Sequence, residues 1–127
     1  MPAMATDLLL VDDDDGFRAV ARTLLRSAGF DVAAESGTGL GALSVFAAVR
    51  PSVVLLDVQL PDIDGFEVAR RLREEPSRPK VVLISTREAH DYGRRVADSG
   101  AEGFISKARL SGAALRAILQ GDERRGG

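Results

Sequence analysis

The 127-residue sequence has no cysteine, no tryptophan, one tyrosine and one histidine. Without cysteine the chain has no disulfide, no thiolate nucleophile and no Cys-based zinc site, and a single histidine excludes a His-cluster metal site. The absence of cysteine is compatible with a reducing compartment, so we expect a cytoplasmic location. With a net charge of −2, the composition does not favour a basic nucleic-acid-binding face.

Long apolar runs are also missing. No run approaches the ~20 residues that span a bilayer, and residues 1–7 lack the charged and apolar regions of a secretory signal. Hydrophobic residues still make up 45% of the chain. These values indicate one globular domain with a core of its own and no membrane segment.

Three short apolar runs predict buried strands, at residues 8–11, 53–56 and 81–84. They do not alternate with polar residues, which is typical of strands that are buried on both faces in a parallel sheet. Weaker strands are expected at residues 32–34 and 103–105. Helical patterns separate the strands, so the order predicts an α/β fold with right-handed crossovers.

The first helical pattern is the clearest. Asp14 or Asp15 can cap its start, and Gly29 can end it. Its apolar face is expected to hold Phe17, Val20, Ala21, Leu24, Leu25 and Ala28. The opposite, solvated face is expected to hold Arg18, Arg22 and Arg26.

The later helices are expected near residues 40–47, 66–72, 89–99 and 110–118. Asp64 and Glu67 form a plausible capping pair for the third. The fourth is poor, because Gly93 lies inside it and Tyr92 and Val96 are its main apolar residues. The last uses Leu110, Ala114, Ala117 and Ile118. Residues 121–127 are polar and Gly-rich, and are expected to form a tail or the start of a linker.

Reactive side chains follow the predicted strands at their carboxyl ends, where open α/β sheets bind ligands. Asp12 and Asp13 follow the first strand, Asp57 the third, Ser85 the fourth and Lys107 the fifth. Carboxylates ~4 Å apart repel by about 4 kcal/mol at an effective dielectric of 20, so a cation must compensate. Oxygen ligands suit Mg²⁺, and a carboxylate can attack phosphorus. The pattern therefore predicts phosphoryl transfer onto Asp57.

At these residues the sequence resembles the receiver domain of two-component response regulators. The resemblance covers nearly the whole chain and rests on four segments with matching order and spacing: residues 11–14, 55–65, 85–86 and 103–107. It implies a single receiver domain over residues 7–120. The implied fold is a doubly wound, parallel five-stranded sheet with strand order 2-1-3-4-5 and helices on both faces.

The resemblance also implies a role for each site residue. Asp57 is the phosphoacceptor, and Lys107 contacts a phosphoryl oxygen. Mg²⁺ or Mn²⁺ is held by Asp12, Asp13, Asp57 and the backbone carbonyl of Gln59. Ser85 is the switch hydroxyl and Phe104 the switch aromatic, although Thr86 is an alternative to Ser85 and Phe104 can equally be plain core. Gln59 and Arg87 tune the lifetime of the phosphoryl group.

The implied partners follow from these roles. The phosphoryl donor is a sensor histidine kinase or a His-phosphotransfer protein. The face formed by the fourth helix, fifth strand and fifth helix then presents an altered surface to an output domain, a partner protein or a second copy. Such a chain is a phosphoacceptor rather than a turnover enzyme, and it binds neither nucleic acid nor membrane directly.

The sequence departs from the common receiver pattern at Ala108, where proline often follows the lysine, so no cis X–Pro bond can form at that step. Three rival hypotheses stay open. Residues 13–16 resemble the D-x-D-G opening of haloacid-dehalogenase-like phosphatases, but Phe17 stands where threonine is expected. A pseudo-receiver would keep the fold without phosphorylation. A flavodoxin-like electron carrier is poorly supported, because no Ser/Thr-rich phosphate loop follows the first strand.

Overall fold

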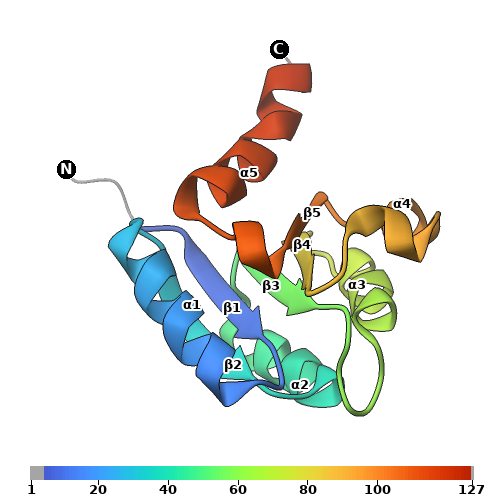
Figure 1. The fold of residues 1–127 in the computed structure, drawn as a ribbon, viewed down its shortest axis with the longest axis horizontal. Helices are drawn as coiled ribbons and strands as arrows, with labels where there is room; N and C mark the ends of the chain where they lie inside the picture. Colours follow the sequence, from blue (N-terminus) through green and yellow to red (C-terminus); the bar gives the residue numbers. More distant parts are fainter. Residues whose placement is uncertain (1–4, 127) are drawn as a thin grey trace.

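The computed structural model describes the backbone of residues 5–126 and the side chains of residues 5–121. Residues 1–4, part of the segment searched for a signal, and residue 127 of the predicted tail lie outside the described residues. Within the described part, parallel strands form one sheet in the order β2-β1-β3-β4-β5, as predicted (Figure 1). The strands are β1 (Asp7–Val11), β2 (Asp31–Ser36), β3 (Val53–Asp57), β4 (Lys80–Ser85) and β5 (Gly103–Ser106).

Helices cover both faces of this sheet (Figure 1). The α-helices are α1 (Asp15–Ser27), α2 (Gly39–Val49), α3 (Gly65–Arg73), α4 (Arg95–Asp98) and α5 (Gly112–Gly126). Two 3₁₀ turns are η1 (Ala89–Tyr92) and η2 (Lys107–Arg109). Because α5 continues beyond residue 120, the domain boundary placed there stays a prediction. Among residues 5–126, no helix is long and apolar enough to cross a membrane.

The sheet separates two hydrophobic cores, because successive residues of a strand face opposite sides. Leu8 and Leu10 of β1 pack with α1 and α5, whereas Leu9 and Val11 pack with α2 and α3. All four side chains are fully buried. The continuous apolar run of β1 therefore has the origin inferred from the sequence, namely burial on both faces.

The predicted ends of α1 are confirmed, whereas its predicted buried and solvated faces are each wrong in part. The Asp14 side chain accepts from the amide of Phe17, and Gly29 follows the helix with a φ of 95°. Val20, however, is 66% exposed rather than part of the buried face. The predicted solvated face is also wrong in part, because Arg18 and Arg22 bend onto β2 and bond the Glu35 carboxylate.

The predicted apolar residues of the last helix are confirmed in part. Leu110, Ala114 and Ile118 pack against the core, although Leu110 precedes α5. Ala117 is exposed, and the unpredicted Leu115 is fully buried. Gly112 lets α5 begin against α1, because a Cβ at Gly112 would lie 2.3 Å from the Cβ of Ala28. Helical periodicity does not reveal this close approach, which fixes the phase of the helix.

The poor fourth helix is not continuous. The 3₁₀ turn η1 ends at Gly93, which has a φ of 59°, and the four-residue α4 follows. A positive φ interrupts the right-handed helical path, and glycine adopts it without steric cost. Neither η1 nor α4 contains a buried residue. The segment from residue 89 to 98 is therefore only weakly embedded in the fold.

Candidate functional site

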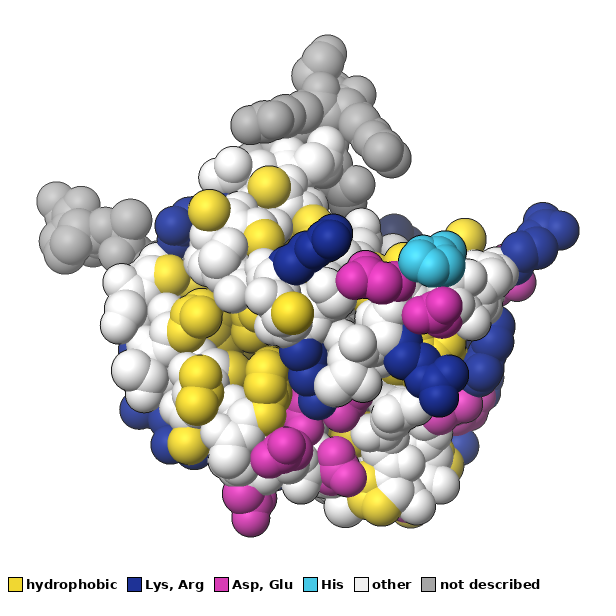
Figure 2. Space-filling model, viewed as in Figure 1, with side chains coloured by type: hydrophobic (Ala, Val, Ile, Leu, Met, Phe, Trp, Pro, Cys, Tyr) yellow, Lys and Arg dark blue, Asp and Glu magenta, His cyan; other side chains and the backbone are white. Residues whose placement is uncertain are grey.

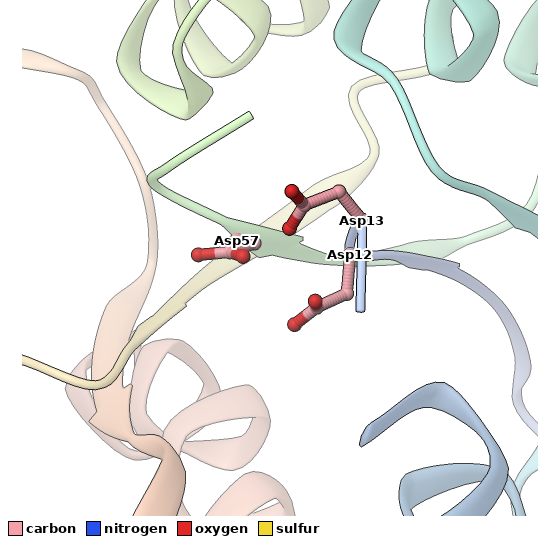
Figure 3. A group of neighbouring side chains, drawn as sticks. All are labelled: Asp12, Asp13 and Asp57. Atoms are coloured by element: carbon pink, nitrogen blue, oxygen red, sulfur yellow. The ribbon is translucent and has the colours of Figure 1, made fainter. Parts of the chain in front are cut away.

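Three carboxylates meet where β1 and β3 end. Asp12 directly follows β1 and Asp57 is the last residue of β3; they are 0% and 3% exposed, whereas Asp13 is exposed. One oxygen atom from each of the three residues lies within 4.8 Å of the others. Figure 3 shows the side chains reaching to the same side of the two strand ends. The parallel register of β1 and β3 produces this cluster, as predicted for adjacent strand ends.

Lys107 completes the cluster from the end of β5. Its Nζ lies 2.6 Å from Oδ2 of Asp12 and 3.2 Å from Oδ2 of Asp57. The ammonium group also lies 4.6 Å from the ring centroid of Phe17, which supports a cation–π contact. In Figure 2 acidic and basic side chains adjoin in the lower centre of the view. The ammonium group thus offsets part of the repulsion among the carboxylates.

The pKa of Asp57 reflects a balance between burial and the charges around it. Burial, reinforced by the negative charge of Asp12, raises the pKa of Asp57 to about 6, although the amide of Gln59 and Lys107 favour its ionised form. Burial lowers the pKa of Lys107, but its pairing with Asp12 and Asp57 outweighs burial and raises it. Lys107 therefore stays charged, and Asp57 gains from any further positive charge placed beside it.

The donor set fits a hard divalent cation. The cluster offers oxygen atoms only, and one of its three carboxylates is open to solvent. Backbone amides hold the other two in place: Asp14 donates to Oδ1 of Asp12 and Gln59 donates to Oδ1 of Asp57. Mg²⁺ and Mn²⁺ favour such oxygen ligands, with water completing the coordination.

Arg18 supports this site, a role that the sequence pattern did not indicate. Its guanidinium donates to the backbone carbonyl of Asp12 and to the carboxylates of Asp15 and Glu35. Gly37 leaves room for it, because a Cβ there would lie 3.2 Å from Nη1 of Arg18. The basic residues at every fourth position of α1 do not predict these contacts, because Glu35 lies on β2 and Asp12 follows β1.

Ser85 is brought to the same edge of the sheet, but its hydroxyl is engaged elsewhere. The side chain is fully buried; its Oγ lies 2.6 Å from the Tyr92 hydroxyl and accepts from the amide of Arg87 at 3.1 Å. Thr86 is exposed, which favours Ser85 as the inward hydroxyl. The sequence predicted Tyr92 only as an apolar helix residue. Its hydroxyl contact depends on the turn at Gly93, which no periodicity reveals.

Phe104 belongs to an aromatic cluster with Tyr92 and Phe66. The ring of Tyr92 lies 5.3 Å from that of Phe66, in an edge-on arrangement, and 6.0 Å from that of Phe104. Phe104 is half-buried and packs against the core on this face of the sheet, which fits either of its two predicted roles. Arg87, also predicted for this side of the site, lies exposed at the surface.

Residues 8–120 match the response regulator receiver domain family. The chain belongs to this family and is the receiver domain of a two-component response regulator. The fold agrees with that of the chemotaxis response regulator CheY4 of Vibrio cholerae, with a TM-score of 0.76 at 26% identity over 93% of this chain and 98% of that one. The doubly wound, five-stranded fold implied by the resemblance is thereby confirmed.

Curated relatives are transcriptional regulators. The chain is 36% identical to the transcriptional regulatory protein AfsQ1 of Streptomyces coelicolor, over 92% of this chain and 52% of AfsQ1. It is 31% identical to the DNA-binding transcriptional activator EvgA of Escherichia coli, over 78% of this chain and 48% of EvgA. The chain thus spans about half the length of the curated relatives it matches.

Proposed function

We propose that this chain accepts a phosphoryl group on Asp57 from a phosphohistidine of a sensor histidine kinase or a His-phosphotransfer protein. The observation that carries the proposal is the setting of Asp57: a 3% exposed carboxylate at a strand end, 3.2 Å from Lys107 and clustered with Asp12 and Asp13. A buried acid beside a fixed cation and two further carboxylates is suited to a reaction in which charge develops on phosphoryl oxygens.

The step forms one bond and breaks one. A carboxylate oxygen of Asp57 attacks phosphorus, the P–N bond to the donor imidazole breaks, and the imidazole leaves with its electron pair and takes up a proton. Lys107 stabilises charge on a phosphoryl oxygen. Mg²⁺ or Mn²⁺, held by Asp12, Asp13, Asp57 and the Gln59 carbonyl, would neutralise further charge. The product is an acyl phosphate whose later hydrolysis resets the chain, so this is switching rather than enzymatic turnover.

The surrounding residues then convert phosphorylation into a surface change. Ser85 moves to the phosphoryl group and Phe104 follows it, while Gln59 and Arg87 influence how fast water reaches the acyl phosphate. The face that changes is α4–β5–α5. It contains a groove lined by Phe104 and side chains of the neighbouring elements, including Glu88, Arg109 and Ile118.

The output lies with a partner of this face. Because the curated relatives are about twice as long, we infer that an output domain or a separate protein reads the receiver. A homodimer through α4–β5–α5 is the alternative partner. The receiver itself contacts neither nucleic acid nor membrane in this scheme, and its phosphoryl donor places it in the cytoplasm.

The test is the intact mass of the protein after incubation with a small acyl phosphate, with and without Mg²⁺. We expect one phosphoryl adduct that requires the metal and is lost in Asp57→Asn. Asp31→Asn is a matched control, because it removes an exposed carboxylate at the opposite end of the sheet. This control should be phosphorylated as efficiently as the wild-type chain.

Two outcomes would contradict the proposal. No adduct under any condition would leave a pseudo-receiver, which uses the fold for binding alone. Steady release of phosphate that survives Asp57→Asn but not Asp13→Asn would indicate the phosphatase chemistry suggested by residues 13–16.

A further inference from the structure

The hydroxyl of Tyr92 is in hydrogen-bond contact with the hydroxyl of Ser85. The two hydroxyl oxygens are 2.6 Å apart, a short distance for a neutral pair. Ser85 is fully buried, so its hydroxyl has no water to replace a lost partner. Its Oγ also accepts a hydrogen bond from the amide of Arg87 at 3.1 Å. In this state the partners of the Ser85 hydroxyl are Tyr92, on η1, and the amide of Arg87, just before η1.

Tyr92 is itself held by its ring rather than by its backbone. The ring packs between Phe66 on α3 and Phe104 on β5, and Arg95 lies 4.3 Å from the Phe66 ring centroid. Its backbone belongs to a four-residue 3₁₀ turn that ends at the positive φ of Gly93. The hydroxyl pair is therefore a link between a buried strand end and a weakly held surface segment.

We propose that Tyr92 is a positioning residue that holds the Ser85 hydroxyl away from Asp57 until Asp57 carries a phosphoryl group. This inference rests on the proposed function, in which Ser85 donates to a phosphoryl oxygen. To do so, Ser85 exchanges its bond with Tyr92 for one with the phosphoryl group. Tyr92 then loses its polar anchor, and residues 89–98 are released from the edge of the sheet.

The energetic consequence has a definite sign. A net hydrogen bond contributes about 0.5–1.5 kcal/mol, so releasing it in advance should favour the phosphorylated conformation by about 2- to 12-fold. Tyr92→Phe removes the hydroxyl and keeps the ring between Phe66 and Phe104. The variant should therefore bind a phosphoryl mimic more tightly than the wild-type chain does.

The experiment titrates Mg²⁺ and beryllofluoride, a phosphoryl mimic, into the protein and follows bound fluoride by ¹⁹F NMR. Four chains are compared: wild type, Tyr92→Phe, Ser85→Ala and the double variant. We expect Tyr92→Phe to tighten binding by about 2- to 12-fold, and to have no effect once Ser85 is alanine. The second comparison separates control of Ser85 from a general effect on folding.

Weaker binding by Tyr92→Phe would overturn the proposal, because Tyr92 would then support the phosphorylated state. Unchanged binding, or an equal gain in the Ser85→Ala background, would overturn it too. Failure of the wild-type chain to bind beryllofluoride with Mg²⁺ would instead count against the proposed function, so the two failures are distinguishable.

A second measurement uses the wild-type chain alone. Tyr92 is the only tyrosine and the chain has no tryptophan, so its ultraviolet fluorescence reports this one side chain. Adding Mg²⁺ and beryllofluoride should change the tyrosine emission in the wild-type chain and leave it unchanged in Asp57→Asn. Unchanged emission in a wild-type chain that binds the mimic would contradict the release of Tyr92.

Discussion

The site of Asp57 lies between two regions that are built very differently. On one side, the 13-residue α1 is capped by Asp14, buries Ala21 and Leu25, and is tied to β2 through Glu35. On the other side, η1 and α4 have four residues each and bury none. The first region supports the backbone of Asp12 through Arg18, and the second contacts the Ser85 hydroxyl through Tyr92. The firmly packed α1 and the weakly packed η1 and α4 therefore lie on opposite sides of Asp57.

The difference has a physical basis in burial. A segment that buries little apolar surface opens at a lower free energy than the fold as a whole. Opening of residues 89–98 exposes only partly buried side chains such as Tyr92 and Val96, whereas opening of α1 exposes Leu25 and the core beneath it. The proposed response to phosphorylation, a shift of residues 89–98, therefore does not require α1 to unfold.

The strongest test removes side-chain volume from the α4 segment and from the core against which α1 packs. Leu55→Ala, in fully buried β3, should lower the free energy of unfolding by about 2–5 kcal/mol, because it leaves a cavity in the core that β3 shares with α1 and α5. Val96→Ala in α4 should lower it by less than about 1 kcal/mol, since Val96 is only partly buried. Urea unfolding measures both. Equal losses would mean that the α4 segment is as well anchored as the sheet.

The second test places alanine at two glycines with positive φ. Gly29 ends α1 at a φ of 95° and Gly93 ends η1 at 59°, and an added Cβ would meet nothing within 4 Å at either position. Strain of about 1–2 kcal/mol should reduce global stability in Gly29→Ala. In Gly93→Ala it should mainly speed amide hydrogen exchange of residues 89–98. Global loss of equal size in both variants would contradict local opening.

The sequence predicts the parts of the site that depend on strand order. Asp57 and Lys107 could be placed together because each ends a strand of a parallel sheet, and such ends share one edge. Tyr92, Arg18 and Leu115 could not be assigned correctly. Their contacts depend on a turn at Gly93, on the reach of a side chain to β2, and on the close approach of α5 to α1. Each of these contacts is tertiary, so the periodicity of the sequence does not predict it.

A smaller effect is expected from the ion pairs that tie α1 to β2. The hydrogen bond from Arg22, followed by Arg18, lowers the pKa of Glu35 despite a partial burial penalty. Since the folded-state pKa is below the usual 4.5, Glu35 contributes stability above that pH and loses it as the pH falls through the folded pKa. Glu35→Gln should cost about 1 kcal/mol near neutral pH, after allowance for solvent screening.

Thermal or urea unfolding across pH checks this prediction. The gap between Glu35→Gln and the wild-type chain should close in acid, where both side chains are neutral. Asp31→Asn, at the exposed opposite end of β2, serves as the control and should show no such gap. A gap that persisted unchanged in acid would show that the carboxylate charge is not what ties α1 to β2.

The smallest expected effect lies in the movable region. Arg95 donates to Asp64 at 2.8 Å and covers the ring of Phe66, but both charged groups are about half exposed. Arg95→Met should therefore cost only about 0.5 kcal/mol of global stability. Because α4 buries no residue, the contacts of Arg95 with Asp64 and Phe66 contribute much of its local stability. Amide exchange of residues 95–98 should therefore rise several-fold. Arg94→Met, at the neighbouring exposed arginine, is the matched control. Equal amide exchange in both variants would show that Arg95 does not anchor α4 to α3.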